Sequence, residues 1–197
     1  GNLYATALLI DPCEPARLPE LPFIAVLAVR DAVAAQVARG EICVRIKWPN
    51  DLLIDGAKVA GILLESTRLG DGRTAVAIGI GINCQHAPGA TETPATSLLA
   101  CGCAVFPEAL FDDLERALRR VLAVWAGGEG FAEIRADWLA KAGGIGTTIR
   151  VRLMNGEETG VFEAIDATGR LLLRCDDGTV KAISAGDVFF PAGAGAE

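Results

Sequence analysis

The segment Lys47–Glu65 constrains the fold most strongly, because it contains a sharp turn between two short apolar runs. Asp55-Gly56 is a strong signal for a two-residue β-hairpin, so Leu52–Ile54 is predicted to pair antiparallel with Lys58–Glu65. Side chains alternate along a strand. This alternation predicts one face with Lys58, Ala60, Ile62 and Leu64, and an opposite face with Val59, Gly61, Leu63 and Glu65.

Lys58 is the first candidate for a functional residue. The predicted alternation places its ammonium among apolar neighbours, where a charge costs free energy unless an acceptor meets it. A ligand carboxylate or phosphate would be such an acceptor. We therefore predict that this face of the hairpin binds an anion.

The preceding strand is predicted to place further polar groups beside Lys58. Pro49 cannot donate a hydrogen bond to a strand neighbour, so the strand Cys43–Trp48 should end there and present Asn50 and Asp51 at its end. The alternative is that Lys47 and Lys58 are solvated lysines and Asn50-Asp51 a simple turn. The length of the whole motif favours a binding site.

The segment Thr74–Cys84 predicts a strand with two very different faces. Alternation places Val76, Ile78, Ile80 and Ile82 on one face, and Ala75, Ala77, Gly79, Gly81 and Asn83 on the other. Glycine weakens the interior of a strand, and close approach of a ligand or of another backbone is its usual reason. Asn83 ends this bare face with both a donor and an acceptor, which can contact an adenine edge. Tight packing of a helix over the two glycines is the alternative.

Together these segments resemble the catalytic domain of biotin protein ligases, and the resemblance extends from Gly1 to about Phe190. The matching motifs are Lys47-Trp-Pro-Asn-Asp-Leu, Lys58-Val-Ala-Gly-Ile-Leu, Glu65 and Gly79-Ile-Gly-Ile-Asn83, with Gly1-Asn-Leu-Tyr before them and Ala95-Thr-Ser-Leu after them. The resemblance implies two reaction steps. Biotin and MgATP give biotinyl-5'-AMP and pyrophosphate, and the biotinyl group then passes to a lysine of a biotin carboxyl-carrier domain of acetyl-CoA carboxylase.

The resemblance also implies roles for individual residues. Lys58 corresponds to the lysine that holds the biotin carboxylate and then the adenylate phosphate, and it is a catalytic candidate together with Lys47 and Asp51. Asn83 corresponds to the adenine contact. Asn50 and Asp51 correspond to the polar pair near the phosphates and Mg²⁺. The backbone of the ligand pocket is expected to include Gly61, Leu63, Gly79 and Gly81.

One motif of the family lies outside this sequence. Family members carry a Gly-Arg-Gly-Arg-x-Gly-Arg-x-Trp loop shortly before the Gly-Asn-Leu-Tyr segment, whereas this sequence starts at Gly1 and its single methionine is Met154. We therefore expect a chain that is truncated at its N-terminus. One alternative is a lipoate ligase or octanoyl transferase, which would also use a lysine; a transferase would need a reactive cysteine as well, and only Cys101 or Cys103 could be proposed for it. The other alternative is an inactive fragment of the family.

Composition limits the partners and the chemistry. A formal net charge of -7 argues against nonspecific binding to nucleic acid, and no apolar run reaches the length of a membrane span. The six cysteines lack regular metal-binding spacing and are expected to be reduced, as in the cytoplasm. His86 is the only histidine, so histidine-dependent nucleophilic catalysis is not expected. A homodimer is possible.

These patterns predict an α+β fold, with a mixed, largely antiparallel sheet flanked by helices in residues 1–143. After Gly143-Gly144, turn signals about every ten residues predict a small antiparallel barrel in residues 147–191, which resembles the SH3-like C-terminal domain of the family. Expected helices are Phe23–Arg39, Pro107–Ala126, Phe131–Ala142 and a short one from Thr96 or Ser97 to Ala100, and the first expected strand is Leu3–Ile10. Expected C-terminal strands are Thr148–Leu153, Glu158–Ile165, Leu171–Arg174, Thr179–Ile183 and Val188–Phe190.

Overall fold

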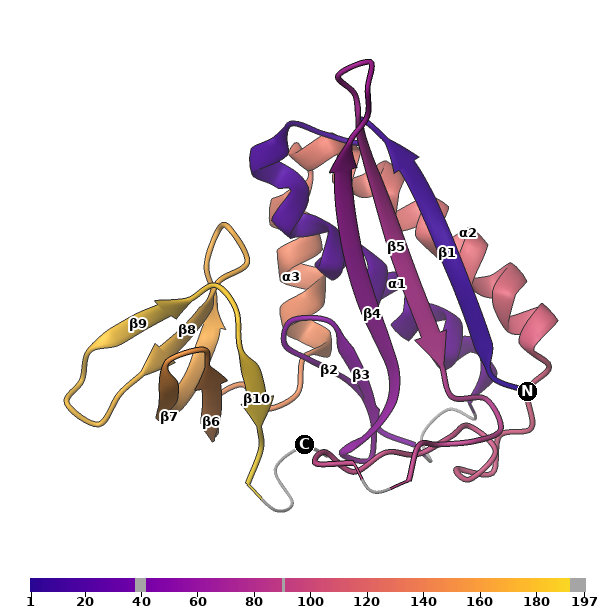
Figure 1. Cartoon of the computed structure of the whole chain (residues 1–197). Coiled ribbons are helices and arrows are strands. Elements are labelled where there is room, and N and C mark those ends of the chain that lie inside the picture. Colours follow the sequence, from indigo (N-terminus) through magenta and orange to yellow (C-terminus); the bar gives the residue numbers. More distant parts are fainter. Residues whose placement is uncertain (38–41, 90, 192–197) are drawn as a thin grey trace.

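The computed structural model describes residues 1–37, 42–89 and 91–191, and its first unit is a five-stranded sheet. The strand order is β1-β5-β4-β3-β2, and every neighbouring pair is antiparallel. Figure 1 shows the three helices together on one side of this sheet. The strands are β1 (Leu3–Ile10), β2 (Val44–Lys47), β3 (Asp51–Ile54), β4 (Ala57–Arg68) and β5 (Thr74–Ile82).

The two faces of β5 differ as its sequence predicts. Val76, Ile78, Ile80 and Ile82 are at most 4% exposed and belong to the hydrophobic core. The opposite face carries Gly79 and Gly81 and is only partly buried. Because burial of apolar side chains is the main stabilising term in folding, the isoleucine face fixes the sheet against the helices. The glycine face is left free for another use.

Helix α1 (Leu21–Gln36) packs against β2, β3 and β4 of the sheet and against both other helices. Ten of its residues are buried, among them Phe23 and Ile24, which agrees with its apolar, Ala-rich sequence. Its expected end at Arg39 lies outside the described residues. Two amphipathic helices, α2 (Pro107–Trp125) and α3 (Phe131–Lys141), pack against it and bury Trp125 and Trp138.

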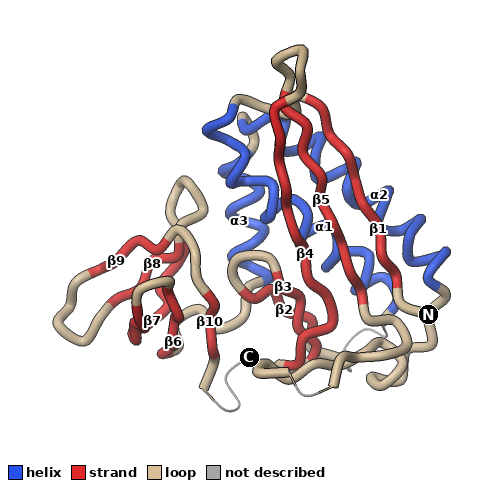
Figure 2. The backbone as a smooth tube through the Cα atoms, in the orientation of Figure 1, coloured by secondary structure: helices blue, strands red, loops and turns tan. Residues whose placement is uncertain are grey.

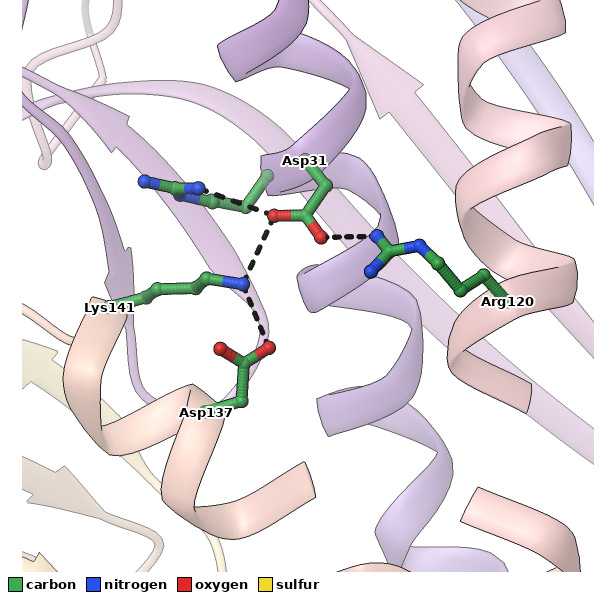
Figure 3. A network of polar contacts seen from close by, with 5 residues as sticks. Asp31, Arg120, Asp137 and Lys141 are labelled. Atoms are coloured by element: carbon green, nitrogen blue, oxygen red, sulfur yellow. Dashed lines mark hydrogen bonds and ion pairs between the residues drawn. The ribbon is translucent and has the colours of Figure 1, made fainter. Parts of the chain in front are cut away.

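A charged network joins the three helices at Asp31 of α1 (Figure 3). Asp31 accepts hydrogen bonds from Arg120 of α2 at 2.6 Å and from Lys141 of α3 at 3.1 Å, and Lys141 also donates to Asp137 at 2.8 Å. Burial opposes ionisation of Asp31, but the hydrogen bonds from Arg120 and Lys141 outweigh it and lower the pKa of the carboxyl group. The network therefore holds the three helices together in the charged state of Asp31.

The second unit is a separate five-stranded antiparallel sheet with the order β10-β6-β7-β8-β9. It contacts the first unit where β2 ends. The indole of Trp48 donates a hydrogen bond to the Gly169 carbonyl at 3.1 Å, and a Cβ at Gly169 would lie 2.6 Å from the Phe23 ring. The strands are β6 (Thr148–Leu153), β7 (Gly156–Ile165), β8 (Leu171–Arg174), β9 (Val180–Ile183) and β10 (Asp187–Phe189).

The predicted α+β class is confirmed, and one predicted element is wrong. Residues 98–102 form consecutive turns in place of a short helix. The predicted cap does exist, because the Ser97 hydroxyl accepts a hydrogen bond from the Ala100 amide at 3.2 Å, but Gly102 with φ +81° turns the chain away. Of the helices that the structure describes, none is long and apolar enough to cross a membrane.

Candidate functional site

A β-bulge decides where Lys58 points. Successive residues of β3 lie opposite Ala60 and then Lys58, so Val59 is an extra residue in β4. Strict alternation placed Lys58 on the face of Ala60 and Ile62, and that prediction is wrong. A Cβ at Gly61 would lie 3.1 Å from both Cε and Nζ of Lys58, so the lysine lies over Gly61 on the glycine face.

Lys58 and Lys47 share one carboxylate. The Lys58 ammonium lies 2.6 Å from Oδ1 of Asp51, and the Lys47 ammonium lies 3.8 Å from Oδ2. Lys47 is only 6% exposed, and this burial lowers the pKa of its amine; repulsion from Lys58 acts in the same direction, while attraction by Asp51 opposes both. Two cations on one carboxylate leave a net positive charge, which an anionic ligand can neutralise.

Two cavities meet at Lys58. The first, which we call the loop cleft, has a volume of about 440 Å³ and lies between the ends of β4 and β5, the segment 91–95 and the C-terminal sheet. The second, the sheet cleft, has a volume of about 450 Å³ and lies over the glycine face beside Tyr4. Lys58, Gly61 and Gly81 line both cavities. An extended ligand can therefore pass over Lys58 from one cavity into the other.

The glycines form the floor of these cavities. Gly81 lies opposite Gly61 in the β4–β5 pair, and Gly79 lies opposite Leu63. A Cβ at Gly81 would meet the Tyr4 ring at 3.6 Å, and one at Gly79 would meet the Leu63 carbonyl at 3.5 Å, which are ordinary contact distances. The helices lie on the other face (Figure 1), so the alternative of tight helix packing over these glycines is wrong. The small side chains keep the space over the sheet open.

Asn83 lies at the edge of the loop cleft, and its position depends on the chain that follows β5. That chain runs past the ends of β3 and β4 (Figure 2), where the Lys58 amide donates to the Pro94 carbonyl at 2.7 Å. The side-chain amide of Asn83 donates to the Thr96 carbonyl at 3.0 Å and lines the cleft. This interaction fixes the orientation of the asparagine and leaves its carbonyl oxygen as an acceptor.

Asn50 differs from the other predicted site residues. Its side-chain amide donates to the Ile62 carbonyl at 2.8 Å, and Asn50 is not among the residues that line either cavity. Asn50 therefore connects the turn between β2 and β3 to β4. Leu63 lines the sheet cleft and is 66% exposed. The structure thus brings Lys47, Asp51, Lys58 and Asn83 to one cavity and leaves Asn50 outside it.

The C-terminal sheet contributes residues that the sequence did not reveal. Arg152 of β6, and Asp187 and Phe189 of β10, line the loop cleft together with Glu92. The sequence patterns predicted no site residue in this sheet. No local pattern marks these side chains, because only the docking of the two sheets brings them to the cavity.

Comparisons with known proteins agree with this geometry. Residues 1–83 match the family described as "Biotin/lipoate A/B protein ligase family", and residues 144–190 match "Biotin protein ligase C terminal domain". The chain is 43% identical to a biotin–[acetyl-CoA-carboxylase] ligase of Paracoccus denitrificans, over 96% of this chain and 80% of that protein. It is 37% identical to the Mycobacterium tuberculosis protein of the same name, over 85% of this chain and 61% of that protein.

A solved structure shows the same fold with ligands bound. The biotin protein ligase of Aquifex aeolicus in complex with biotin and ATP superposes with a TM-score of 0.79 at 26% sequence identity, covering 96% of this chain and 78% of that one. Fold and cavities define an enzyme of the biotin and lipoate ligase class. With 43% identity over most of a curated relative, the chain belongs to the biotin protein ligase family.

Proposed function

We propose that this protein activates biotin with ATP to give biotinyl-5'-AMP, and then transfers the biotinyl group to a lysine of a biotin carboxyl-carrier domain. The observation that carries the proposal is the position of Lys58, over a glycine floor at the junction of two cavities. A ligand with an apolar acyl part and an anionic nucleotide part needs such a junction. The choice of biotin as the acyl group, and of a carboxylase as the partner, is based on the names of the relatives.

In the first step a biotin carboxylate oxygen bonds to the α-phosphorus of ATP, and the bond from that phosphorus to the bridging oxygen of pyrophosphate breaks. Both reactants are anions, so catalysis requires positive charge where they meet. The Lys58 ammonium has three N–H donors and uses one for Asp51, so two remain for the carboxylate and the phosphate. Asp51 orients Lys58, and the buried Lys47 adds a second positive charge.

In the second step the amine of the carrier lysine attacks the acyl carbon of the mixed anhydride, and AMP leaves. Lys58 can then stabilise the phosphate of the leaving AMP. Water competes with the carrier lysine for the anhydride, so the cavity must exclude it. Apolar side chains on both sides of the glycine floor, such as Tyr4 and Leu63 in the sheet cleft, favour this exclusion.

We further propose that Mg²⁺ enters with ATP. The described residues contain no group of three or more side chains that could hold a metal by themselves. Mg²⁺ commonly takes one or two protein carboxylates and completes its shell with substrate phosphates and water. Asp51 fits the role of the protein ligand, whereas the amide of Asn50 is engaged with the Ile62 carbonyl. When bound, the ion would neutralise phosphate charge.

We propose a catalytic unit in residues 1–143 and a small β domain in residues 147–191, which the separate pairing of the two sheets supports. All six cysteines are free thiols, which supports a reducing compartment such as the cytoplasm. We also propose a homodimer. The acidic net charge of -7 disfavours nonspecific binding to nucleic acid.

The test is biotin-dependent exchange of pyrophosphate into ATP by the full-length protein, followed by labelling of a carrier domain. We expect exchange and labelling with biotin, and no labelling with lipoate or octanoate. Labelling with lipoate or octanoate instead of biotin would assign the protein to the other branch of the superfamily. Absence of exchange with all three acids would contradict the proposed first step.

A further inference from the structure

Cys101 and Cys103 form a pair of thiols that the proposed reaction does not use. Both are free and partly buried, and Gly102 with φ +81° turns the chain between them. The Cys103 thiol lies 3.8 Å from the Cys101 carbonyl oxygen, so its sulfur lies close to the backbone of Cys101. Cα atoms two residues apart are at most about 7 Å apart even in an extended chain, and a turn shortens this distance. A disulfide needs about 4.4 to 6.8 Å between Cα atoms, so the pair can form one.

The segment just before the two cysteines holds two residues of the ligand site. The Lys58 amide donates to the Pro94 carbonyl at 2.7 Å, and the Thr96 amide donates to the Lys58 carbonyl at 2.9 Å. The Thr96 carbonyl accepts the side-chain amide of Asn83 at 3.0 Å, and the Leu98 amide donates to the main-chain carbonyl of Asn83 at 2.8 Å. The orientations of Lys58 and Asn83 therefore depend on how this segment is folded.

The two cysteines close the segment into a turn. Both of their amides donate to the Leu98 carbonyl, at 3.1 Å from Cys101 and 2.8 Å from Cys103. The Cys101 sulfur also lies 3.4 Å from the Thr96 hydroxyl, which is within hydrogen-bond distance for sulfur. A disulfide sulfur carries no hydrogen and is fixed beside its partner sulfur, so oxidation would weaken the contact between Cys101 and Thr96. Thr96 in turn holds Asn83, and oxidation of the pair therefore reaches the ligand site.

The short spacing makes such a disulfide reversible. A disulfide stabilises a protein mainly by closing a long loop, whereas this one would enclose only Gly102. Both cysteines are also partly exposed. Strained or exposed disulfides have more oxidising potentials and are readily reduced, and in reducing compartments disulfides are usually transient and sense the redox state. The pair thus has the properties of a switch rather than those of a structural cross-link.

We propose that Cys101 and Cys103 are a redox modification site, and that a disulfide between them weakens binding of biotinyl-5'-AMP. This inference rests on the proposed reaction, whose intermediate is that adenylate. Lys58 and Asn83 keep their own chemistry in the oxidised protein but lose the fixed support of segment 94–98. The predicted consequence is a reversible loss of affinity at a site that the disulfide does not touch.

The oxidant is a small disulfide such as oxidised glutathione, and the exchange conserves electrons and protons. One cysteine thiolate attacks a sulfur of that disulfide, whose S–S bond breaks and releases one glutathione thiolate. The second cysteine thiolate attacks the protein sulfur of the mixed disulfide and releases the other glutathione thiolate. The two protons that the cysteines lose are taken up by the two released thiolates. The protein pair is thus oxidised to a disulfide while glutathione is reduced.

The first test asks whether the disulfide forms. The full-length protein is equilibrated with oxidised glutathione, and its tryptic peptides are analysed by mass spectrometry before and after treatment with dithiothreitol. The peptide that contains both cysteines should lose two hydrogens and regain them on reduction. Cys84 lies in the same peptide but is only 1% exposed, so it should stay reduced. A stable glutathione adduct, or no oxidation at all, would contradict the assignment.

The second test measures binding of biotinyl-5'-AMP to the reduced and the oxidised protein by calorimetry. We expect oxidation to weaken binding about fivefold, which corresponds to one hydrogen bond, and reduction to restore it. Cys103→Ser cannot form the disulfide and should bind equally with and without the oxidant. Cys175→Ser is the matched control and should respond like the wild type, because it removes a partly buried thiol directly after β8 and leaves the pair intact. Equal affinity of the oxidised and the reduced wild type would overturn the proposal.

Hydrogen exchange separates this inference from the proposed function, because it needs no ligand. Oxidation should speed exchange of the Lys58 and Thr96 amides, which bond across the segment, and should leave the amides of β8 unchanged. In a protein that does not bind biotinyl-5'-AMP, faster exchange supports the effect of the disulfide on the site and contradicts only the proposed function. Unchanged exchange in the oxidised protein overturns the coupling, even where biotin-dependent exchange of pyrophosphate is normal.

Discussion

Asp31 and Asp51 each receive two or more cationic side chains, yet their surroundings give them different roles. Asp31 lies among α1, α2 and α3, and its partners Arg120 and Lys141 connect the helices (Figure 3). Asp51 holds Lys47 and Lys58 beside a cavity of about 440 Å³. An aspartate with two cationic partners thus stabilises helix packing at Asp31, where side chains fill the surrounding space. At Asp51 the same arrangement is available for ligand binding, because glycines keep the space beside it open.

Filling the open space should have the largest effect on binding. Valine is favourable in strands, and a Cβ at Gly81 would make only ordinary contact with Tyr4, so Gly81→Val should fold normally. The branched side chain would occupy both cavities, and overpacking of this kind should weaken binding of biotinyl-5'-AMP by about a hundredfold. Isothermal titration calorimetry of the variant measures the loss.

Ala77→Val is the matched control for this prediction. Ala77 lies on the same face of β5 but does not line either cavity. Its replacement should leave the affinity for biotinyl-5'-AMP unchanged. If both variants bind like the wild type, the glycine face is not the floor of the ligand site.

Removing the charge of Asp31 should affect stability and leave binding intact. Asp31→Asn leaves Arg120 and Lys141 without their carboxylate partner at a site where the aspartate side chain is only 17% exposed. We expect the free energy of unfolding to fall by about 2 kcal/mol, because charged hydrogen bonds of a partly buried group are lost. Urea denaturation measures this change.

The control for Asp31 is Asp137→Asn. Asp137 is 45% exposed and, within the part of the chain that the structure describes, pairs only with Lys141, so its replacement should cost clearly less stability. If Asp31→Asn lost as much nucleotide affinity as a variant of the cleft, Asp31 and Asp51 would not differ in role as described above.

The stabilisation by ionised Asp31 should also appear, at smaller magnitude, in the pH dependence of the free energy of unfolding. The pKa of Asp31 is lower in the folded state than its ordinary value of 3.8, because the hydrogen bonds from Arg120 and Lys141 outweigh burial. The contribution of ionised Asp31 to the free energy of unfolding is therefore complete above about pH 4. This contribution is lost as the pH falls through the lowered pKa. The difference in unfolding free energy between wild type and Asp31→Asn should narrow in this acid range. A difference that widens as the pH falls would show the opposite sign of the pKa shift.

The sequence predicted most strands and the unequal faces of β5, because alternation and glycine turns are local properties. Asp55-Gly56 forms the expected hairpin turn, and β1 and β8 have the expected bounds. The side on which Lys58 lies was predicted wrongly, because the bulge at Val59 depends on pairing with β3. Arg152 could not be predicted, since two sheets that fold from separate segments bring it to the cleft.

The central claim is that Lys58 binds the acyl nucleotide over the glycine floor, and affinity for biotinyl-5'-AMP tests it most directly. Lys58→Ala should weaken binding at least about tenfold, because it removes charge-assisted hydrogen bonds, with little change in unfolding free energy. Lys141→Ala, which removes a lysine from the Asp31 network, should lower stability and leave this affinity unchanged. Wild-type affinity in Lys58→Ala would contradict the claim.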